Sequence, residues 1–382
     1  MLGMTSRERF LTAIRNGQPD RVPCAPDFSN MIPCKLTGRP FWDVYYHGSP
    51  PLWRAYLEAA RYFGIDAWFV DYDGPMRYSY PVPLQRERII RSHSAERMVV
   101  AERIRTPAGD LEAETTYYVG DPPTRTVKPI KDLKRDWAKV RYLLQVPEAC
   151  DPYQVAWQKR ELGESGVYGL HVGTPGFQAW FGLFEGGVEA LSYLYHDAPE
   201  LLDELRELHE RALLRQAEMV IDARPDFILT GGSGAITLQS PAIARRFTLP
   251  TLQKITRMAK EAGVATMVHS CGKEYALVRM CAEETDLDCI NPLEEPPMGD
   301  CDLAQVKREF GHRLALMGNL HTTNVMLMGT PEEVEHAARR AIDAAGAGGG
   351  FILSTGDQCG RDTPEENIRA LVRVCETYGR YE

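Results

Sequence analysis

Short apolar runs that alternate with helical patterns are the feature of this chain that most restricts its fold. Eight such runs can be marked, and from the third onward each is followed by apolar residues at helical spacing. Strands alternating with helices predict parallel β-α-β units, and eight of them predict a (β/α)8 TIM barrel, an α/β fold. The runs lie at residues 22–28, 66–70, 167–172, 226–231, 264–270, 288–292, 314–319 and 351–355.

Other segments add to this barrel. An N-terminal helical extension is expected at the start of the chain. In residues 85–128, "ERMVVAERIRTPAGDLEAETTYYVG" alternates at period two around "TPAGD", which predicts an inserted β-hairpin. Two helix starts are also predicted, with Asp197 capping a helix whose first turn holds Pro199, and with Thr330 capping a helix that begins at Pro331. No interdomain linker is evident, so we expect one barrel domain over residues 1–382.

Charge and hydropathy exclude several classes of partner. The net charge is −9 and no basic stripe is interleaved with aromatic residues, which argues against nucleic acid. No apolar run approaches the roughly 20 residues that span a membrane. The opening "MLGMTSRERFLTAIRNG" lacks the pattern of a signal peptide, so a cytoplasmic location is expected. The nine cysteines are an odd number on a long chain, which favours reduced thiols.

A histidine and a cysteine stand two residues apart at the end of the fifth run. Residues i and i+2 of a strand share one face, so His269 and Cys271 are expected to point the same way. Cys359 follows the eighth run, and in a barrel all strands end at one common face. One nitrogen and two sulfurs suit zinc, and three protein ligands leave a fourth position open. The alternative is a half-buried histidine beside an inert thiol.

Several blocks of this sequence resemble the uroporphyrinogen decarboxylase superfamily, and the resemblance extends over nearly the whole chain. The blocks are "MTSRERFLTAIRNGQPDRVP", "HSCG", "INPLEEPPMGDCDLAQVKREFG", "LMGNL", "GTPEEVEHAARRAI", "GGGFILSTGDQ" and "TPEENIRAL". The resemblance implies a (β/α)8 barrel. The porphyrinogen decarboxylases carry an arginine-rich loop where this chain has "APDFSN" at residues 25–30, so a clamp for a carboxylated tetrapyrrole is missing.

The corrinoid-dependent methyltransferase branch of that superfamily is the better match. That branch holds zinc with an H-x-C motif and a cysteine after the last strand, a pattern that His269, Cys271 and Cys359 resemble. The resemblance then implies a cobalt corrinoid (cobalamin) as methyl carrier. Because the chain has no D-x-H-x-x-G corrinoid-binding signature, the cofactor would arrive on a separate corrinoid protein.

The favoured activity is demethylation of a methoxylated aromatic, an O-demethylase reaction. Aromatic and polar side chains near the expected barrel mouth are the candidate substrate-binding residues: Tyr45, Tyr46, Trp68, Tyr72, His171, Asn291 and Asn319. Glu294 and Asp357 are candidates for orienting a zinc-bound histidine or for occupying the fourth zinc position, and thus for a part in catalysis.

Two other classes of function stay open at this point. One is a metal-independent decarboxylase of a small carboxylated substrate, which would need a cationic pocket. The other is a non-catalytic protein that binds a tetrapyrrole or corrinoid without turnover. A homodimer is the default expectation for the assembly.

Overall fold

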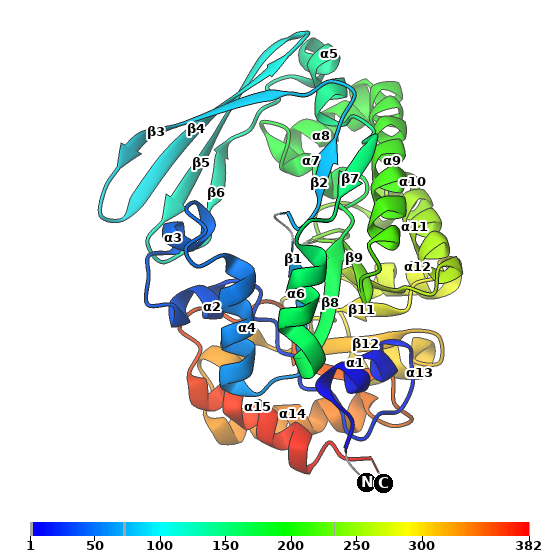
Figure 1. The fold of residues 1–382 in the computed structure, drawn as a ribbon. Coiled ribbons are helices and arrows are strands. Elements are labelled where there is room, and N and C mark those ends of the chain that lie inside the picture. Colours follow the sequence, from blue (N-terminus) through cyan, green and yellow to red (C-terminus); the bar gives the residue numbers. More distant parts are fainter. Residues whose placement is uncertain (1–2, 72–73, 233, 382) are drawn as a thin grey trace.

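A seven-stranded parallel sheet forms the centre of the molecule (Figure 1). The computed structural model describes residues 3–71, 74–232 and 234–381 of the chain. Seven of the eight predicted strands are confirmed, in the order in which they follow one another along the chain. They are β1 (Ala67–Asp71), β8 (Gly166–His171), β9 (Phe227–Gly231), β10 (Ala265–His269), β11 (Cys289–Asn291), β12 (Ala315–Leu320) and β13 (Phe351–Thr355).

The first predicted strand, at residues 22–28, is reduced to a single bridge. Cys24 forms one parallel bridge with Leu353 of β13, and its carbonyl accepts a hydrogen bond from the amide of Asp66 at 2.8 Å. The segment around Cys24 therefore lies between the two edge strands of the sheet. Proline at residues 23 and 26 removes two ladder donors, which explains why a regular strand does not form there. A closed barrel of eight strands was expected. The structure has a curled sheet of seven strands that is not continuously closed.

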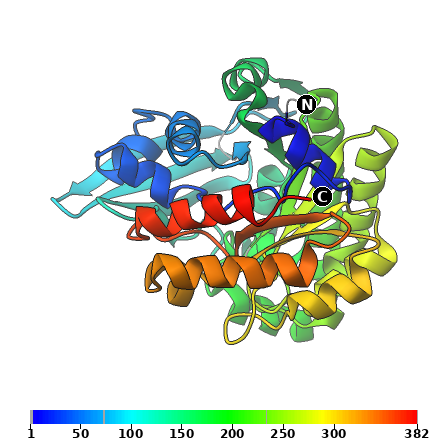
Figure 2. The same ribbon diagram turned by 90° about the horizontal axis from the view of Figure 1, so that it is seen from below.

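Helices follow the strands and stand around the sheet (Figure 2). Thr330 caps its helix as predicted, within a capping box with Glu333, but Ala198 rather than Asp197 occupies the cap position of α9, because Asp197 is the last residue of α8. No described helix has the length and apolar character needed to cross a membrane. These helices are α8 (Gly187–Asp197), α9 (Pro199–Asp222), α10 (Pro241–Phe247), α11 (Leu249–Glu261), α12 (Tyr275–Glu284), α13 (Leu303–Phe310), α14 (Pro331–Ala345) and α15 (Glu365–Thr377).

The core has two layers because successive strand residues point to opposite faces. One layer fills the inside of the curled sheet, where α1 (Ser6–Ile14) adds Phe10 and Ile14. The strand residues of this inner layer include Trp68, Val167, Leu229, Met267, Cys289, Met317 and Ile352. Their neighbours pack outward against the helices: Phe69, Tyr168, Ile228, Val268, Ile290, Leu316 and Leu353. Helix α1 belongs to the predicted N-terminal extension, and its apolar side chains form part of the inner layer.

The insertion between β1 and β8 is larger than the predicted hairpin. Strands β4 (Arg97–Thr106) and β5 (Gly109–Tyr118) form that hairpin, and β3 (Gln85–His93) and β6 (Thr124–Val127) extend it to a four-stranded antiparallel sheet. Every residue of β3 is exposed, so it lacks the apolar alternation that marks a strand in sequence. The insertion also contains a small sheet of β2 (Arg77–Ser79) and β7 (Ala149–Asp151), with helices α5 (Leu133–Leu143) and α6 (Val155–Leu162).

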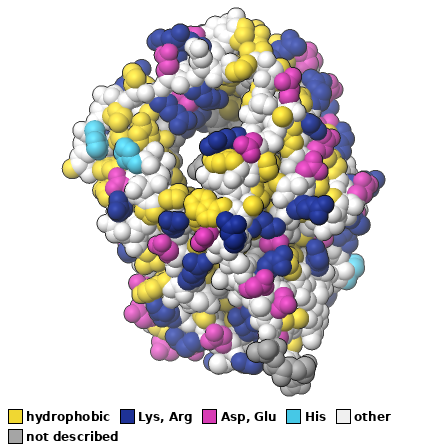
Figure 3. Space-filling view, viewed as in Figure 1, with side chains coloured by type: hydrophobic (Ala, Val, Ile, Leu, Met, Phe, Trp, Pro, Cys, Tyr) yellow, Lys and Arg dark blue, Asp and Glu magenta, His cyan; other side chains and the backbone are white. Residues whose placement is uncertain are grey.

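In Figure 1 the four-stranded sheet stands above α2, α3 and α4, whereas α7 lies beside α8. Figure 3 shows that this face is hollowed between the sheet and the rest of the chain, with hydrophobic and basic side chains around the hollow. The helices are α2 (Met31–Leu36), α3 (Phe41–Tyr45), α4 (Leu52–Phe63) and α7 (Phe177–Phe181), with single turns at Gly163–Ser165 and Thr322–Leu327.

Candidate functional site

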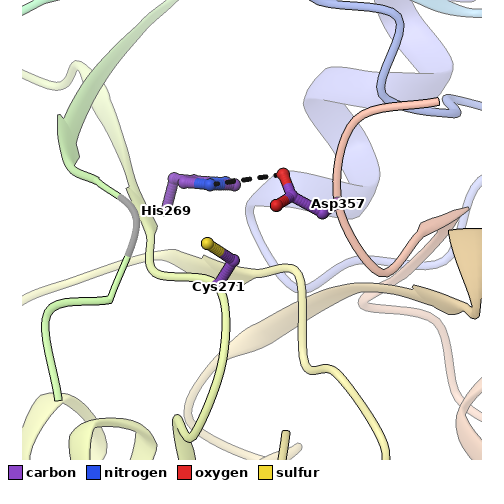
Figure 4. A group of neighbouring side chains, drawn as sticks. All are labelled: His269, Cys271 and Asp357. Carbon is purple, nitrogen blue, oxygen red and sulfur yellow. Dashed lines mark ion pairs between the residues drawn. The ribbon is translucent and has the colours of Figure 1, made fainter. Parts of the chain in front are cut away.

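Three ligand-type side chains converge at the carboxyl end of the central sheet. His269 ends β10, Cys271 follows two residues later, and Asp357 follows β13. Their candidate ligand atoms lie within 4.8 Å of one another, and all three side chains are half-buried. Figure 4 shows them directed toward a common point, with His269 Nε2 3.9 Å from Asp357 Oδ1. Imidazole nitrogen, thiolate sulfur and carboxylate oxygen are the three donor types that zinc takes in proteins, so this group fits the ion.

The turn after β13 presents the carboxylate to His269. The Thr355 hydroxyl donates to the Asp357 carbonyl at 2.7 Å, and the amide of Gln358 donates to Asp357 Oδ1 at 2.8 Å. Both bonds hold the chain in a tight turn directly after the strand. Asp357 therefore faces β10 although it is far from His269 in the sequence.

Cys359, the third ligand predicted from the sequence, lies deeper in the protein. Its amide donates to the Asp27 carbonyl at 2.8 Å, and its fully buried thiol lies 3.9 Å from the Thr355 hydroxyl oxygen. Burial raises the pKa of Cys359 to about 12, with a further contribution from the Asp27 carboxylate. Within the described ranges, the group able to share a metal contains Asp357 and not Cys359.

Asn291 fixes the orientation of His269. Its side-chain oxygen lies 3.2 Å from His269 Nδ1, and its nitrogen is directed to the Met317 sulfur at 3.7 Å. With the amide in this orientation, Nδ1–H is the donor to Asn291, which leaves the lone pair on Nε2 facing Asp357. A backing acceptor of this kind is the usual second partner of a metal-binding histidine. Asn291 was predicted to bind substrate, and its contacts in the structure are with His269 and Met317.

Glu294 adds a carboxylate beside the three ligand-type residues. Its Oε2 accepts a hydrogen bond from the amide of Gly272, the residue after Cys271. Burial raises the pKa of Glu294, and the neighbouring Asp357 carboxylate adds to that rise. Glu294 is not part of the group that shares a common point, and its predicted role in orienting a zinc-bound histidine or occupying the fourth position stays a prediction.

Asp27 was not among the residues singled out in the sequence. Its side chain is buried, and burial raises its pKa to about 6, while nearby His269 lowers it. The Ser29 hydroxyl donates a short hydrogen bond to Asp27 Oδ1. One sequence signal could have identified Asp27. It stands near the end of the first apolar run, and the other candidate residues likewise stand at or after the ends of apolar runs.

A cavity of about 530 Å³ is lined in part by Asp27, whose carboxyl group interacts electrostatically with His269 and Asp357. Tyr45, Tyr46 and Trp68, three of the predicted substrate-binding residues, line its wall. Further aromatic residues from β1, α4 and the segment around α6 complete the lining: Trp53, Tyr56, Phe69, Tyr153 and Trp157. Aromatic walls of this kind suit a flat apolar ligand.

Of the other predicted substrate-binding residues, the described ones (His171, Asn291 and Asn319) are not among the residues that line this cavity. Tyr72 lies outside the described residues. Burial lowers the pKa of His171 to about 4, and its side chain hydrogen-bonds to the backbone of Gly231. Asn319 donates to the Leu293 carbonyl at 3.1 Å and borders a separate cavity of about 240 Å³. The structure therefore brings only part of the predicted substrate set together.

Comparisons with known proteins agree with this architecture. The uroporphyrinogen decarboxylase (URO-D) family model matches residues 167–378, more than half of the chain. A solved structure described as a methyltransferase from Methanosarcina mazei superposes with a TM-score of 0.68 at 18% identity, covering 98% of this chain and 99% of the other. At that identity the likeness shows the fold.

Curated relatives include several methyltransferases. The chain is 28% identical over 177 residues to a methylated-thiol–coenzyme M methyltransferase of Methanosarcina mazei, covering 42% of this chain and 44% of the relative. It is 27% identical over 180 residues to the methylcobamide:CoM methyltransferase MtaA of Methanosarcina barkeri, covering 47% and 50%. A uroporphyrinogen decarboxylase of Coxiella burnetii is 34% identical over 77 residues, covering 20% and 21%. The matches to the two methyltransferases span about half the length of each.

Proposed function

The chain belongs to the uroporphyrinogen decarboxylase family, and we propose that it is a zinc-dependent methyltransferase that works with a separate corrinoid protein. The methyl group would move between a small methylated substrate and the cobalt of the cobalamin on that partner. The convergence of His269, Cys271 and Asp357 beside an aromatic cavity carries the proposal. Relatives named as coenzyme M methyltransferases support the reaction class.

The favoured direction is O-demethylation of a methoxylated aromatic. The methyl–oxygen bond would break with its electron pair left on oxygen, and the reduced corrinoid of the partner protein would supply the electron pair that accepts the methyl group. When bound, zinc supplies a Lewis acid that lowers the pKa of a phenol or thiol and stabilises the departing anion. His269, Cys271 and Asp357 would hold the ion and leave one position open. Glu294 is proposed to orient these ligands or to occupy that position at rest.

The cavity argues against the two other classes of function. A decarboxylase of a carboxylated substrate needs a cationic pocket, and no lysine or arginine is among the described residues that line this one. A protein that only binds a corrinoid or tetrapyrrole does not need three ligand-type side chains around a common point. An observed methyl transfer would distinguish the proposed enzyme from a decarboxylase and from a protein that only binds a corrinoid or tetrapyrrole.

The test is methyl transfer to reduced cobalamin, followed by the visible absorbance of methylcobalamin. We expect zinc-loaded protein to methylate cob(I)alamin from a methoxyarene, and His269→Ala to abolish transfer. His336→Ala is the matched control, because His336 is exposed on α14 and distant in sequence from the ligand-type residues. If methoxyarenes, methylated amines and methylated thiols all fail to exchange a methyl group with the corrinoid, the proposal is wrong.

Four further expectations accompany this proposal. They are a barrel completed by the segment around Cys24, a single domain over residues 1–382, a homodimer and a cytoplasmic location. Each stays a prediction.

A further inference from the structure

We propose that Gln358 positions the candidate ligand Asp357 and couples metal binding to the wall of the large cavity. This inference rests on the proposed function, because it concerns the same metal centre. Among the described residues, Gln358 belongs neither to the three candidate ligands nor to the cavity lining. Its role would therefore be exerted through the two segments that it joins.

The backbone of Gln358 holds the candidate ligand. Its amide donates to Asp357 Oδ1 at 2.8 Å, and this is the oxygen that lies 3.9 Å from His269 Nε2. A carboxylate oxygen that accepts one amide hydrogen bond still has a lone pair for a metal ion. The direction of the Asp357 carboxylate therefore depends on where the backbone of residue 358 is held.

The side chain of Gln358 reaches the start of α2, which is 327 residues away at Met31. Its Oε1 accepts hydrogen bonds from the amide of Asn30 at 3.3 Å and from the amide of Met31 at 3.1 Å. Asn30 occupies the N-cap position of α2, but its own side chain makes no capping hydrogen bond. Amides at the start of a helix have no partner within it, so Gln358 supplies the cap that Asn30 does not.

The start of α2 is part of the cavity wall. Ser29 and Asn30 line the cavity of about 530 Å³. Farther along α2, Cys34 packs in one apolar cluster with Val44 and Tyr45 of α3, which line the same cavity. A displacement of the first turn of α2 would therefore change the shape of the wall.

A second contact joins the same two segments through backbone groups alone. The amide of Cys359 donates at 2.8 Å to the carbonyl of Asp27, a residue that also lines the cavity. This bond does not depend on the side chain of Gln358. Removal of that side chain should thus loosen the turn after β13 without releasing it, so a partial loss of metal affinity is expected.

The coupling between the two segments is reciprocal, as any coupling free energy is. Fixing the Asp357 carboxylate at a metal ion would hold the backbone of Gln358 and, through its side chain, the first turn of α2. Equally, a turn that is already anchored to α2 loses less freedom when Asp357 binds the ion, which strengthens metal binding. The amides of Asn30 and Met31 are the groups that should respond to the metal.

Hydrogen exchange followed by mass spectrometry, with and without zinc, tests this coupling without a substrate or a corrinoid. In the wild-type protein we expect zinc to slow the exchange of the amides of Asn30 and Met31 at least about fivefold. In Gln358→Leu, which has no acceptor for these amides, zinc should leave their exchange unchanged.

Zinc affinity, measured by competition with a chromophoric chelator, gives the reciprocal readout. Gln358→Leu should bind zinc about tenfold more weakly, because the turn that presents Asp357 is no longer anchored to α2. Gln358→Glu keeps an acceptor for the two amides and should bind zinc at least as tightly as the wild-type protein. Lys35→Ala is the matched control. It breaks an exposed 3.2 Å ion pair between α2 and Asp362 of the same loop, and it should change neither readout.

Two results would overturn the inference. One is an equal zinc affinity for Gln358→Leu and the wild-type protein, and the other is exchange of the α2 amides that zinc does not slow in the wild-type protein. The second measurement needs no substitution, so it decides the question even if Gln358→Leu fails to fold, which circular dichroism would reveal. In both cases zinc bound to the wild-type protein would leave the proposed function standing. A wild-type protein that binds no zinc would instead contradict the metal centre of the proposed function, so the two failures are distinguishable.

Discussion

His269 Nε2 and Asp357 Oδ1 face each other across 3.9 Å at the carboxyl ends of β10 and β13. This separation is too long for a direct hydrogen bond, yet both atoms are directed to one point that Cys271 also borders. An ion at that point would be bound by both atoms at once. The pair therefore makes Asp357 the proposed ligand from the loop after β13.

Removing the acceptor behind His269 should weaken zinc binding. In Asn291→Leu the Nδ1–H of His269 loses its partner, so the imidazole is no longer held in the tautomer that presents Nε2. We expect the zinc affinity to fall about 10- to 100-fold, as measured by competition with a chromophoric chelator. Asn291→Asp keeps an acceptor at the same place and should retain the affinity. Equal affinities for the leucine variant and the wild-type protein would refute this role.

The fully buried carboxylate of Asp66 should contribute strongly to folding stability. Its oxygens accept from Arg9 Nη1 at 2.6 Å, from Arg21 Nη1 at 2.9 Å and from the amide of Cys24 at 2.8 Å. Asp66→Ala removes this carboxylate from Arg21 and from Arg9, which keeps only its pairing with Asp20, so we expect a loss of about 3–5 kcal/mol in the free energy of unfolding in urea.

A surface ion pair provides the matched control for Asp66. Asp203 pairs with Arg246 at 2.6 Å, but both side chains are well exposed. Asp203→Ala should therefore cost less than about 1 kcal/mol. Similar losses of unfolding free energy in the two variants would show that burial does not increase the contribution of Asp66 to stability.

Stability should fall in mild acid because His209 is buried in its neutral form. Trp180 Nε1 donates to His209 Nδ1 at 3.2 Å, and burial lowers the pKa of His209 to about 4. An unfolded chain binds this proton near pH 6.5, so the stabilisation is complete above that pH and is lost as the pH falls toward 4. We expect His209 to account for about 2 kcal/mol of the loss in unfolding free energy between pH 7 and 5.

His209→Gln isolates that share of the acid sensitivity. The glutamine oxygen can still accept from Trp180 but does not titrate in this range. Subtraction of the two pH profiles of urea unfolding removes the contribution of His171, whose pKa burial also lowers to about 4. Parallel profiles would mean that His209 takes up its proton equally in the folded and unfolded chains.

The fold was largely predictable because its signal is local. Buried parallel strands such as β9 and β13 are short apolar runs between helical patterns, and seven of them were found. The insertion was underestimated because β3 is a charged, exposed strand that pairs on one side only. Its partner in the sheet, and not its own sequence, determines its conformation.

The candidate site was only partly predictable because the conformation of the loop after β13 determines which side chain is its third member. The H-x-C spacing predicted that His269 and Cys271 point the same way, and the two side chains do lie together although β10 ends at His269 and Cys271 follows the strand. Asp357 and Cys359 both follow β13, and nothing in their spacing indicates that the turn sends the carboxylate to His269 and buries the thiol against Asp27. Asp27 itself was missed because its role depends on contacts between segments far apart in the chain.

The zinc content of three proteins, measured side by side by elemental analysis, tests the central claim most directly. The account predicts about one zinc per chain in the wild-type protein and in Cys359→Ser, and a sharp loss in Asp357→Ala. Zinc retained in Asp357→Ala but lost from Cys359→Ser would contradict the ligand set proposed from the structure and favour the set predicted from the sequence. A wild-type protein that binds no zinc when freshly prepared, reduced and free of chelator would contradict the metal centre itself.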